Sequence, residues 1–270
     1  NLIPFANPES NIKNRVANLT QKAIEIKRMY FASDETCLYF TTLLHKKTNS
    51  YLNHFNLSIL GQALYETGMA DLLSLNNIIE EIDQLISTLY KLTSEDFLFD
   101  IKPYSTRLPN EKLPGITPGI HQDTIIEVSN SLISYLTGII FARWDIRYAT
   151  GERTPPEVPD PFAPLPACPP GMLQNGHGLP AAREDMPPSY PLRISWSGIL
   201  VDDEGHPEDI VGRTHETLQV IWEEKAEAIE TEACEILGIG SLRDYFQKSS
   251  LFFADHLKRY SKSRRYAPIY

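Results

Sequence analysis

Apolar residues recur at three- and four-residue spacing along several long stretches of the chain. Between positions 60 and 92 a broad apolar face from Ile78 to Tyr90 opposes an acidic face, and positions 121–148 are largely apolar. This spacing is typical of amphipathic helices and predicts one helix in each stretch. A further helix is predicted after Pro8-Glu9-Ser10, where the apolar stripe consists of Ile12, Val16, Leu19, Ala23, Ile26 and Tyr30.

Proline interrupts the helical pattern in the middle of the chain. Twelve of the 20 prolines lie between Pro155 and Pro191. Proline fixes its own backbone angle and lacks a donor, so no helix and no central strand is expected there. The stretch is either an exposed linker or an extended segment on the surface. Partial packing is favoured by its embedded apolar residues, which are Phe162, Leu165, Met172, Leu173 and Leu179.

The C-terminal quarter returns to regular structure. Alternation from Leu192 to Val201 predicts one strand. Pro207-Glu208-Asp209 is expected to start a helix, because acids near a helix N-terminus complement its dipole. Helix is predicted to continue through 216–237 and to end at Gly238, with short helices at 241–248 and 250–260.

These elements predict a mainly α fold with minor β structure. We expect three parts: a bundle-like helical spacer over 1–150, a Pro-rich extended segment over 151–191, and a strand with short helices over 192–270.

Composition narrows the class of protein. The chain has 270 residues, of which 42% are hydrophobic and 10% aromatic, as expected of a folded protein. No apolar run reaches the roughly 18 residues of a membrane helix. The three cysteines, Cys37, Cys168 and Cys234, are widely separated and give neither a disulfide framework nor a metal-spaced pair, so a reducing cytoplasm is the default location. A net charge of −10 argues against a general nucleic-acid coat but allows a local basic patch.

No metal or nuclease motif is complete. The run His215-Glu216-Thr217-Leu218-Gln219 begins like a zinc-protease helix, but its last residue replaces the second histidine ligand. A restriction-type nuclease needs carboxylates and a lysine around Mg²⁺. Asp160 lies among prolines, and Glu223-Glu224-Lys225 lies on a predicted helix where a strand is required. Asp202-Asp203-Glu204 could hold a cation, although a solvated acidic turn is the simpler interpretation.

No cofactor loop or methyl-transfer turn is complete either. Gly238-Ile239-Gly240 lacks a third glycine and follows a predicted helix, so a C-cap explains it. An amino-methyltransferase needs an Asn/Asp-Pro-Pro-aromatic turn to hold the target base. Asn7-Pro8-Glu9-Ser10 has neither the second proline nor the aromatic residue. We therefore expect this chain to contribute no catalytic residue, metal ligand or cofactor contact.

Two clusters of cations are candidate DNA contacts. Phosphate binding needs a local positive field, and aromatic rings beside the cations can add stacking on the bases. The weaker cluster contains Arg143, Arg147 and Arg153 around Trp144, and its alternative is that Arg143 and Arg147 pair with Asp145 or Glu152. For the stronger cluster the alternative is a solvated helix end, where cations complement the dipole. Its members fall within eight residues and alternate with Tyr260 and Tyr266: Lys258, Arg259, Lys262, Arg264 and Arg265.

Four stretches carry a recognisable pattern: Ile82-Asp83-Gln84-Leu85 through Leu89-Tyr90-Lys91-Leu92-Thr93, Ser134-Tyr135-Leu136-Thr137-Gly138 through Ala142-Arg143-Trp144-Asp145, Pro159-Asp160-Pro161-Phe162, and most of 192–270. The pattern that these stretches belong to extends over about two-thirds of the chain. They resemble the C-terminal half of the PglX-like (BREX-type) adenine-specific DNA methyltransferases of phage-defence systems and of related single-chain restriction–modification enzymes. Three positions depart from that pattern, because Lys91 and Ala142 replace glycines and Tyr266 replaces a lysine.

The resemblance implies a noncatalytic spacer and DNA-recognition segment of an adenine methyltransferase. In that family the S-adenosylmethionine loop and the catalytic turn lie upstream of the matched region, and the sequence continues beyond position 270. We therefore expect a piece of a longer protein whose parent enzyme uses S-adenosylmethionine. The implied partners are DNA, the parent's catalytic domain and other defence-system subunits. The alternative is a helical scaffold that docks such subunits without binding DNA, because its acidic surface repels phosphate.

Overall fold

The computed structural model describes residues 7–43, 56–92, 121–160 and 162–261. Within these ranges the chain is mainly helical and contains no sheet. The predicted mainly α fold class is therefore confirmed.

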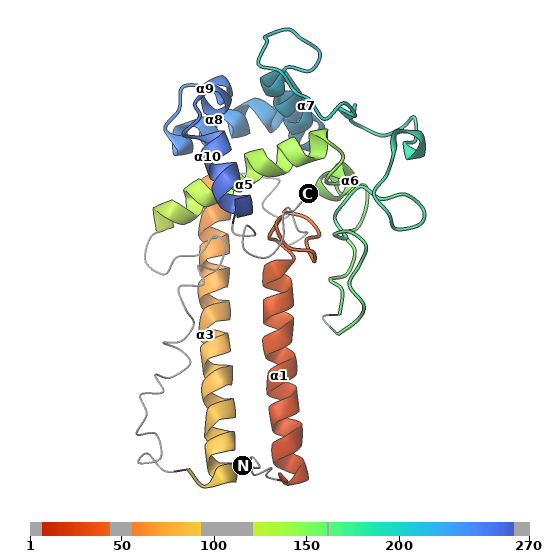
Figure 1. Cartoon of the computed structure of the whole chain (residues 1–270). Helices are drawn as coiled ribbons and strands as arrows, with labels where there is room; N and C mark the ends of the chain where they lie inside the picture. Colours follow the sequence, from red (N-terminus) through yellow and green to blue (C-terminus); the bar gives the residue numbers. More distant parts are fainter. Residues whose placement is uncertain (1–6, 44–55, 93–120, 161, 262–270) are drawn as a thin grey trace.

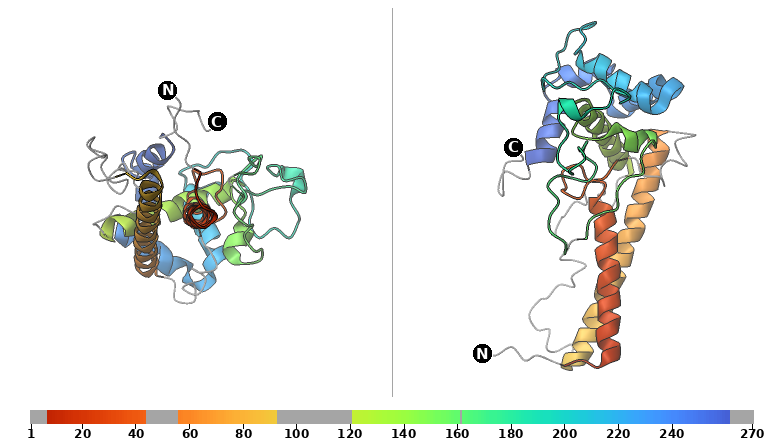
Figure 2. Two further views of the ribbon diagram at one scale, coloured as in Figure 1. Left: turned by 90° about the horizontal axis from the view of Figure 1, so that it is seen from below. Right: turned by 90° about the vertical axis from the view of Figure 1, so that its right-hand side faces the viewer.

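Two long helices form an arm that projects from the rest of the molecule. Helix α1 spans Ser10–Phe31 and helix α3 spans Leu57–Tyr90, and the two lie side by side and antiparallel (Figures 1 and 2). Both were predicted from their apolar stripes. Leu19 of α1 and Leu75 and Ile78 of α3 are buried, and an exposed ion pair links the two helices through Arg15 and Glu81.

Helix α3 ends in a left-handed residue. Lys91 takes φ 52°, and the amide of Leu92 donates to the Ser87 carbonyl oxygen at 2.9 Å. The left-handed conformation is unfavourable for residues with a Cβ atom, whereas glycine adopts it freely.

We expect Lys91→Gly to stabilise the chain by roughly 0.5–1 kcal/mol, because it relieves the left-handed strain at an exposed position. The free energy of unfolding in urea checks this expectation. Lys91→Ala is the control and should leave stability within a few tenths of a kcal/mol. A glycine variant no more stable than the alanine variant would contradict the expectation.

The remaining helices build a head at one end of the arm (Figure 1). Helix α5 (His121–Ile140) crosses that end and packs on α3, on α7 (Ile210–Trp222) and on α8 (Ala226–Leu237). The largest apolar cluster combines Leu57 and Leu60 of the arm with Leu132 and Leu136 of α5 and with Leu218 of α7. It thus joins residues from the expected 1–150 and 192–270 parts. The helices are α5 (His121–Ile140), α6 (Ile146–Thr150), α7 (Ile210–Trp222), α8 (Ala226–Leu237), α9 (Leu242–Gln247) and α10 (Phe252–Ser261).

The helix predicted over 121–148 is wrong beyond Ile140. Ala142 is left-handed at φ 63°, and the Arg143 amide donates back to Gly138 at 2.9 Å. The Trp144 ring then folds against Gly138, where an added Cβ would lie 2.5 Å from the ring. Glycine at 138 therefore makes room for the turn that separates α5 from α6.

The strand predicted at 192–201 is also wrong. Leu192 and Ile194 are buried, as the alternation suggested. However, the amide of Ser195 donates to the Ile140 carbonyl at the end of α5, and Gly198 turns the chain at φ 70°. A strand needs a neighbouring ladder, and this segment binds a helix end instead. Its single β-bridge pairs Val201 with Asp209.

The helix predicted to run through 216–237 is interrupted as well. A 3₁₀ turn at Glu223–Lys225 separates α7 from α8, and Glu223 has φ 51°. The start of α7 agrees with expectation, because the Asp209 carboxylate accepts from the Gly212 amide at 3.0 Å and caps the helix.

The Pro-rich segment packs on the head and the arm instead of forming regular structure, apart from a 3₁₀ turn at Arg183–Asp185. Leu173 is buried. The Gly171 amide donates to the Phe40 carbonyl, and its own carbonyl accepts from Asp145. Phe162 remains 82% exposed, so the segment is only partly packed, as its embedded apolar residues suggested.

None of the helices in the described ranges is long and apolar enough to span a bilayer.

Candidate nucleic-acid interface

A buried carboxylate anchors α10, the helix that carries the first candidate cations. Glu35, in the turn after α1, is only 5% exposed. Its Oε1 accepts a hydrogen bond from Ser134 Oγ of α5 at 2.6 Å and lies 3.3 Å from Arg259 Nε. Arg259 is therefore engaged within the fold, with Ser131 Oγ as a further acceptor at 2.9 Å.

A second set of contacts holds α10 from its other end. The Tyr245 hydroxyl of α9 donates to Asn130 Oδ1 at 2.7 Å and approaches Asp255 Oδ2 at 3.2 Å. Phe252 packs edge-on against Tyr245 and Phe246, with ring centroids 5.8 and 4.9 Å away. Both halves of α10 are thus fixed to α5 and α9, which gives its exposed side a defined direction.

Arg143 joins this cluster although it lies far from α10 in sequence. Its guanidinium lies 4.8 Å from the centre of the Tyr260 ring and 4.9 Å from that of Trp144, distances suited to cation–π attraction. The sequence placed Arg143 and Arg259 in separate clusters. The structure brings both near Glu35 and Tyr260, where each guanidinium group opposes the rise that burial causes in the pKa of these two residues.

The electrostatics of the cluster follow from burial. Burial raises the pKa of Glu35, opposed by Arg259, the Ser134 hydrogen bond and Arg143. The pKa of His256 is lowered to about 4 by burial, with Arg143 and Arg259 adding repulsion. At neutral pH His256 is therefore uncharged.

This cluster does not have the geometry of a hydrolytic triad. In a triad the histidine lies between the nucleophile and the acid. Here Ser134 lies between them, donating to Glu35 and approaching His256 Nδ1 only at 3.5 Å. The residues anchor a helix, and the arrangement provides no base for Ser134.

Arg147 is engaged elsewhere. Its guanidinium donates to the Asp145 carboxylate from Nε at 2.8 Å and from Nη2 at 2.7 Å, and it lies over the Tyr190 ring at 5.1 Å. Asp145 is fully buried and also pairs with Arg153. The Asp145 alternative weighed for Arg147 is therefore the observed contact.

Lys258 differs from these arginines. It lies on the exposed side of α10, three positions before the helix ends at Ser261. The candidates Lys262, Arg264 and Arg265 lie outside the described residues. The described part of the chain therefore places one exposed candidate cation, Lys258, immediately before those three in sequence.

The other motifs serve structural roles. His215 Nδ1 lies 2.7 Å from Glu230, and its Nε2 lies 3.0 Å from Gln219 Nε2. No group of three or more possible metal ligands gathers among the residues that the structure describes. In the acidic turn, Asp202 pairs with Arg243. Gly238 has φ 65° and ends α8, as the C-cap interpretation requires.

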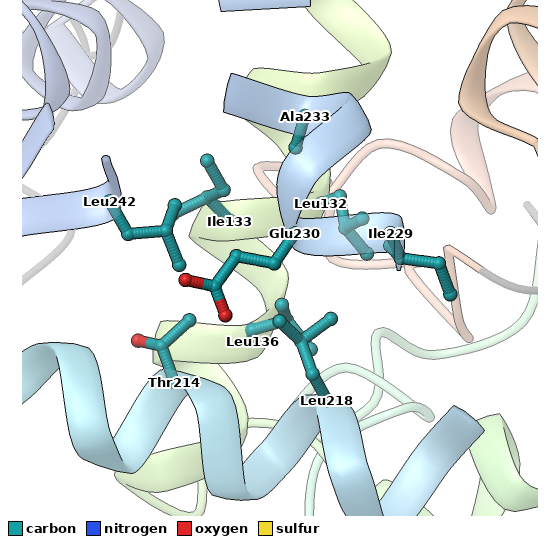
Figure 3. A pocket seen from close by; sticks show the side chains of 9 residues that line it. All are labelled: Leu132, Ile133, Leu136, Thr214, Leu218, Ile229, Glu230, Ala233 and Leu242. Carbon is teal, nitrogen blue, oxygen red and sulfur yellow. The ribbon is translucent and has the colours of Figure 1, made fainter. Parts of the chain in front are cut away.

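The described cavities do not add a ligand pocket in the head. A cavity of about 10 Å³ lies between α5, α7 and α8, lined mainly by aliphatic side chains such as Leu136, Leu218 and Ile229, together with Glu230, whose carboxylate points toward Thr214 (Figure 3). That volume is near the minimum for one water molecule. A groove of about 440 Å³ lies between α1 and residues 154–158, which Arg28 ties together by donating to the Val158 carbonyl.

Sequence reasoning missed the residues that fix α10. Glu35, Ser131 and His256 carry no motif, and Ser134 was noted only within a family pattern. Their shared site forms by tertiary packing between distant parts of the chain. The one available signal was Glu35 itself, a few residues after the last stripe residue of the first predicted helix, and an acid at such a place is equally expected to be solvated.

Comparison with known proteins gives no relative: no family model, curated protein or solved structure matches the chain.

Proposed function

We propose that the chain is a noncatalytic spacer and DNA-recognition segment of an adenine-specific DNA methyltransferase of a phage-defence or restriction–modification system. The arm is the spacer, and the end of α10 with the following basic residues contacts DNA phosphates. In this proposal S-adenosylmethionine and the catalytic domain belong to the parent enzyme. The parent enzyme is located in the cytoplasm.

The observation that best supports the DNA contact is that side-chain contacts fix α10 to the rest of the fold. Glu35 and Ser131 engage Arg259, so the helix is held and Lys258 faces outward. The sequence adds Lys262, Arg264 and Arg265 directly after the helix. A basic cluster that starts from an anchored helix keeps its first phosphate contact in place, which reduces the entropy lost on binding.

The backbone supports the family assignment. The pattern that the sequence resembles has glycine at positions 91 and 142, where this chain has Lys91 and Ala142. Both residues take the left-handed conformation, with φ 52° and 63°. Glycine is the residue that this conformation favours, so the two departures occur at positions where a glycine pattern has a physical reason.

Neutralising the basic cluster should weaken DNA binding by about tenfold or more near physiological salt, because each lost phosphate contact lowers affinity. The variant carries Lys258→Ala, Lys262→Ala, Arg264→Ala and Arg265→Ala, and fluorescence anisotropy with a duplex oligonucleotide measures its dissociation constant.

A matched control separates this cluster from overall charge. It removes four other exposed cations that lie outside α1, by Lys91→Ala, Arg183→Ala, Lys225→Ala and Lys248→Ala, and should bind almost as tightly as the original chain. Equal losses in the two variants would contradict a localised phosphate contact.

A helical scaffold that docks defence-system subunits is the second candidate. Arg147 and Arg259 both pair with carboxylates, so neither is free to contact DNA phosphate. The net charge of −10 also opposes DNA binding, and both observations favour the scaffold. A chain that captures partner subunits but binds no DNA at low salt would favour this candidate over the first.

A further inference from the structure

Helix α3 carries an apolar face that continues from the head along the arm. At the head, Gly61 approaches α5 so closely that an added Cβ would lie 2.8 Å from Ile125 Cγ1. Leu72, Ile79 and Ile86 follow Gly61 at spacings of 11, 18 and 25 residues, which return to the same side of an α-helix. The face covered by α5 therefore extends beyond the end that α5 crosses (Figure 1).

This face is poorly covered on the arm. Ile86 is 40% exposed and Tyr90, four residues further, is 41% exposed. Leu72 and Ile79 are half-buried. A pair of helices buries one seam between them, and apolar residues beside that seam need further helices to exclude water.

The two helices of the arm carry opposite charge. Like helices of two arms would repel each other, whereas unlike helices would attract. Helix α3 contains no Lys or Arg, and its acids are Glu66, Asp71, Glu80, Glu81 and Asp83. Helix α1 contains one acid, Glu25, and its cations are Lys13, Arg15, Lys22, Lys27 and Arg28.

We propose that two copies of the chain pair through their arms as a four-helix bundle, with α1 of each copy against α3 of the other. Such an isologous interface repeats every contact twice and needs a self-complementary surface, which one basic and one acidic helix provide. The two-fold axis runs along the arm, so that neighbouring helices are all antiparallel, as in up-down-up-down bundles.

The ion pair between Arg15 and Glu81 fixes which residues lie at the same level of the arm. Moving two residues outward on each antiparallel helix places Lys13 level with Asp83. A two-fold axis along the arm keeps these levels, so Lys13 lies opposite Asp83 of the partner subunit. Both side chains are exposed, and the described chain has no ion pair between them.

Sedimentation velocity over a micromolar concentration series tests the bundle. We expect a dimer that Ile86→Glu weakens by about tenfold or more, since a charge would enter the buried seam. Leu73→Glu is the matched control, because Leu73 is 59% exposed and lies on the other side of α3. Circular dichroism establishes that both variants remain helical.

A charge exchange identifies the occupant as a second copy. Lys13→Glu alone and Asp83→Lys alone should each weaken the dimer about fivefold, because two like-charged pairs replace two attractive ones. Mixing the two single variants should restore a dimer that contains one of each. The proposal is overturned by a chain that stays monomeric, by equal effects at 73 and 86, or by a mixture that does not associate.

Discussion

Gly171→Ala should destabilise the chain by about 3 kcal/mol or more. A Cβ at this position would lie 1.9 Å from the carbonyl oxygen of Thr41, which is backbone and cannot rotate away. Gly171 also joins two parts of the fold, because it donates to Phe40 and accepts from Asp145. A shift that relieves the clash would therefore move the Pro-rich segment away from Phe40 and Asp145 and weaken both hydrogen bonds. The midpoint and slope of urea unfolding measure the loss.

Gly176→Ala is the matched control in the same segment. An added Cβ there meets no atom within 4 Å, so stability should change by less than about 0.5 kcal/mol. If the two glycine variants unfolded at the same urea concentration, the close packing assigned to Gly171 would be wrong.

Asp145→Ala should cost about 3–5 kcal/mol, the usual loss when one partner of a buried ion pair is removed. The Asp145 carboxylate is fully buried, and it accepts from the Arg147 guanidinium and caps α6 through the Arg147 amide. The substitution leaves the Arg147 side chain, 12% exposed, without its carboxylate. Thermal and urea unfolding both report this change.

Arg153→Ala provides the comparison for the same carboxylate. Arg153 is 50% exposed and lies 3.3 Å from Asp145 Oδ2, so its loss should cost less than about 1 kcal/mol. A larger loss for Arg153→Ala than for Asp145→Ala would reverse the assigned order of importance.

The helices could be predicted where a local period decides the structure. The stripes of α1 and α3 repeat over many turns, and burial of one face selects a helix whatever lies on the other side. The boundaries inside 121–148 could not be predicted, because they depend on the Trp144 ring folding into the space at Gly138. The predicted strand failed because alternation reports side-chain burial but not whether a neighbouring strand exists.

The sequence predicts which cations lie close together along the chain, but not which of them the fold engages. A run of cations in the sequence identifies a basic stretch, but exposure decides which of them can reach a phosphate. Arg259 forms an ion pair with Glu35, near the other end of the chain, and Arg147 forms one with Asp145, two residues away. The second partner was foreseeable from spacing, whereas the first arises from packing between α10, α5 and the turn after α1.

The salt dependence of DNA binding tests the proposed function most directly. Counterion release makes log K fall with log salt concentration, by about 0.9 for each phosphate neutralised. We expect the slope to become shallower by about 3–4 when Lys258, Lys262, Arg264 and Arg265 are all replaced by alanine, and to be unchanged in the four-cation control. Equal slopes for the original chain and the basic-cluster variant, or no binding at low salt, would contradict the proposal.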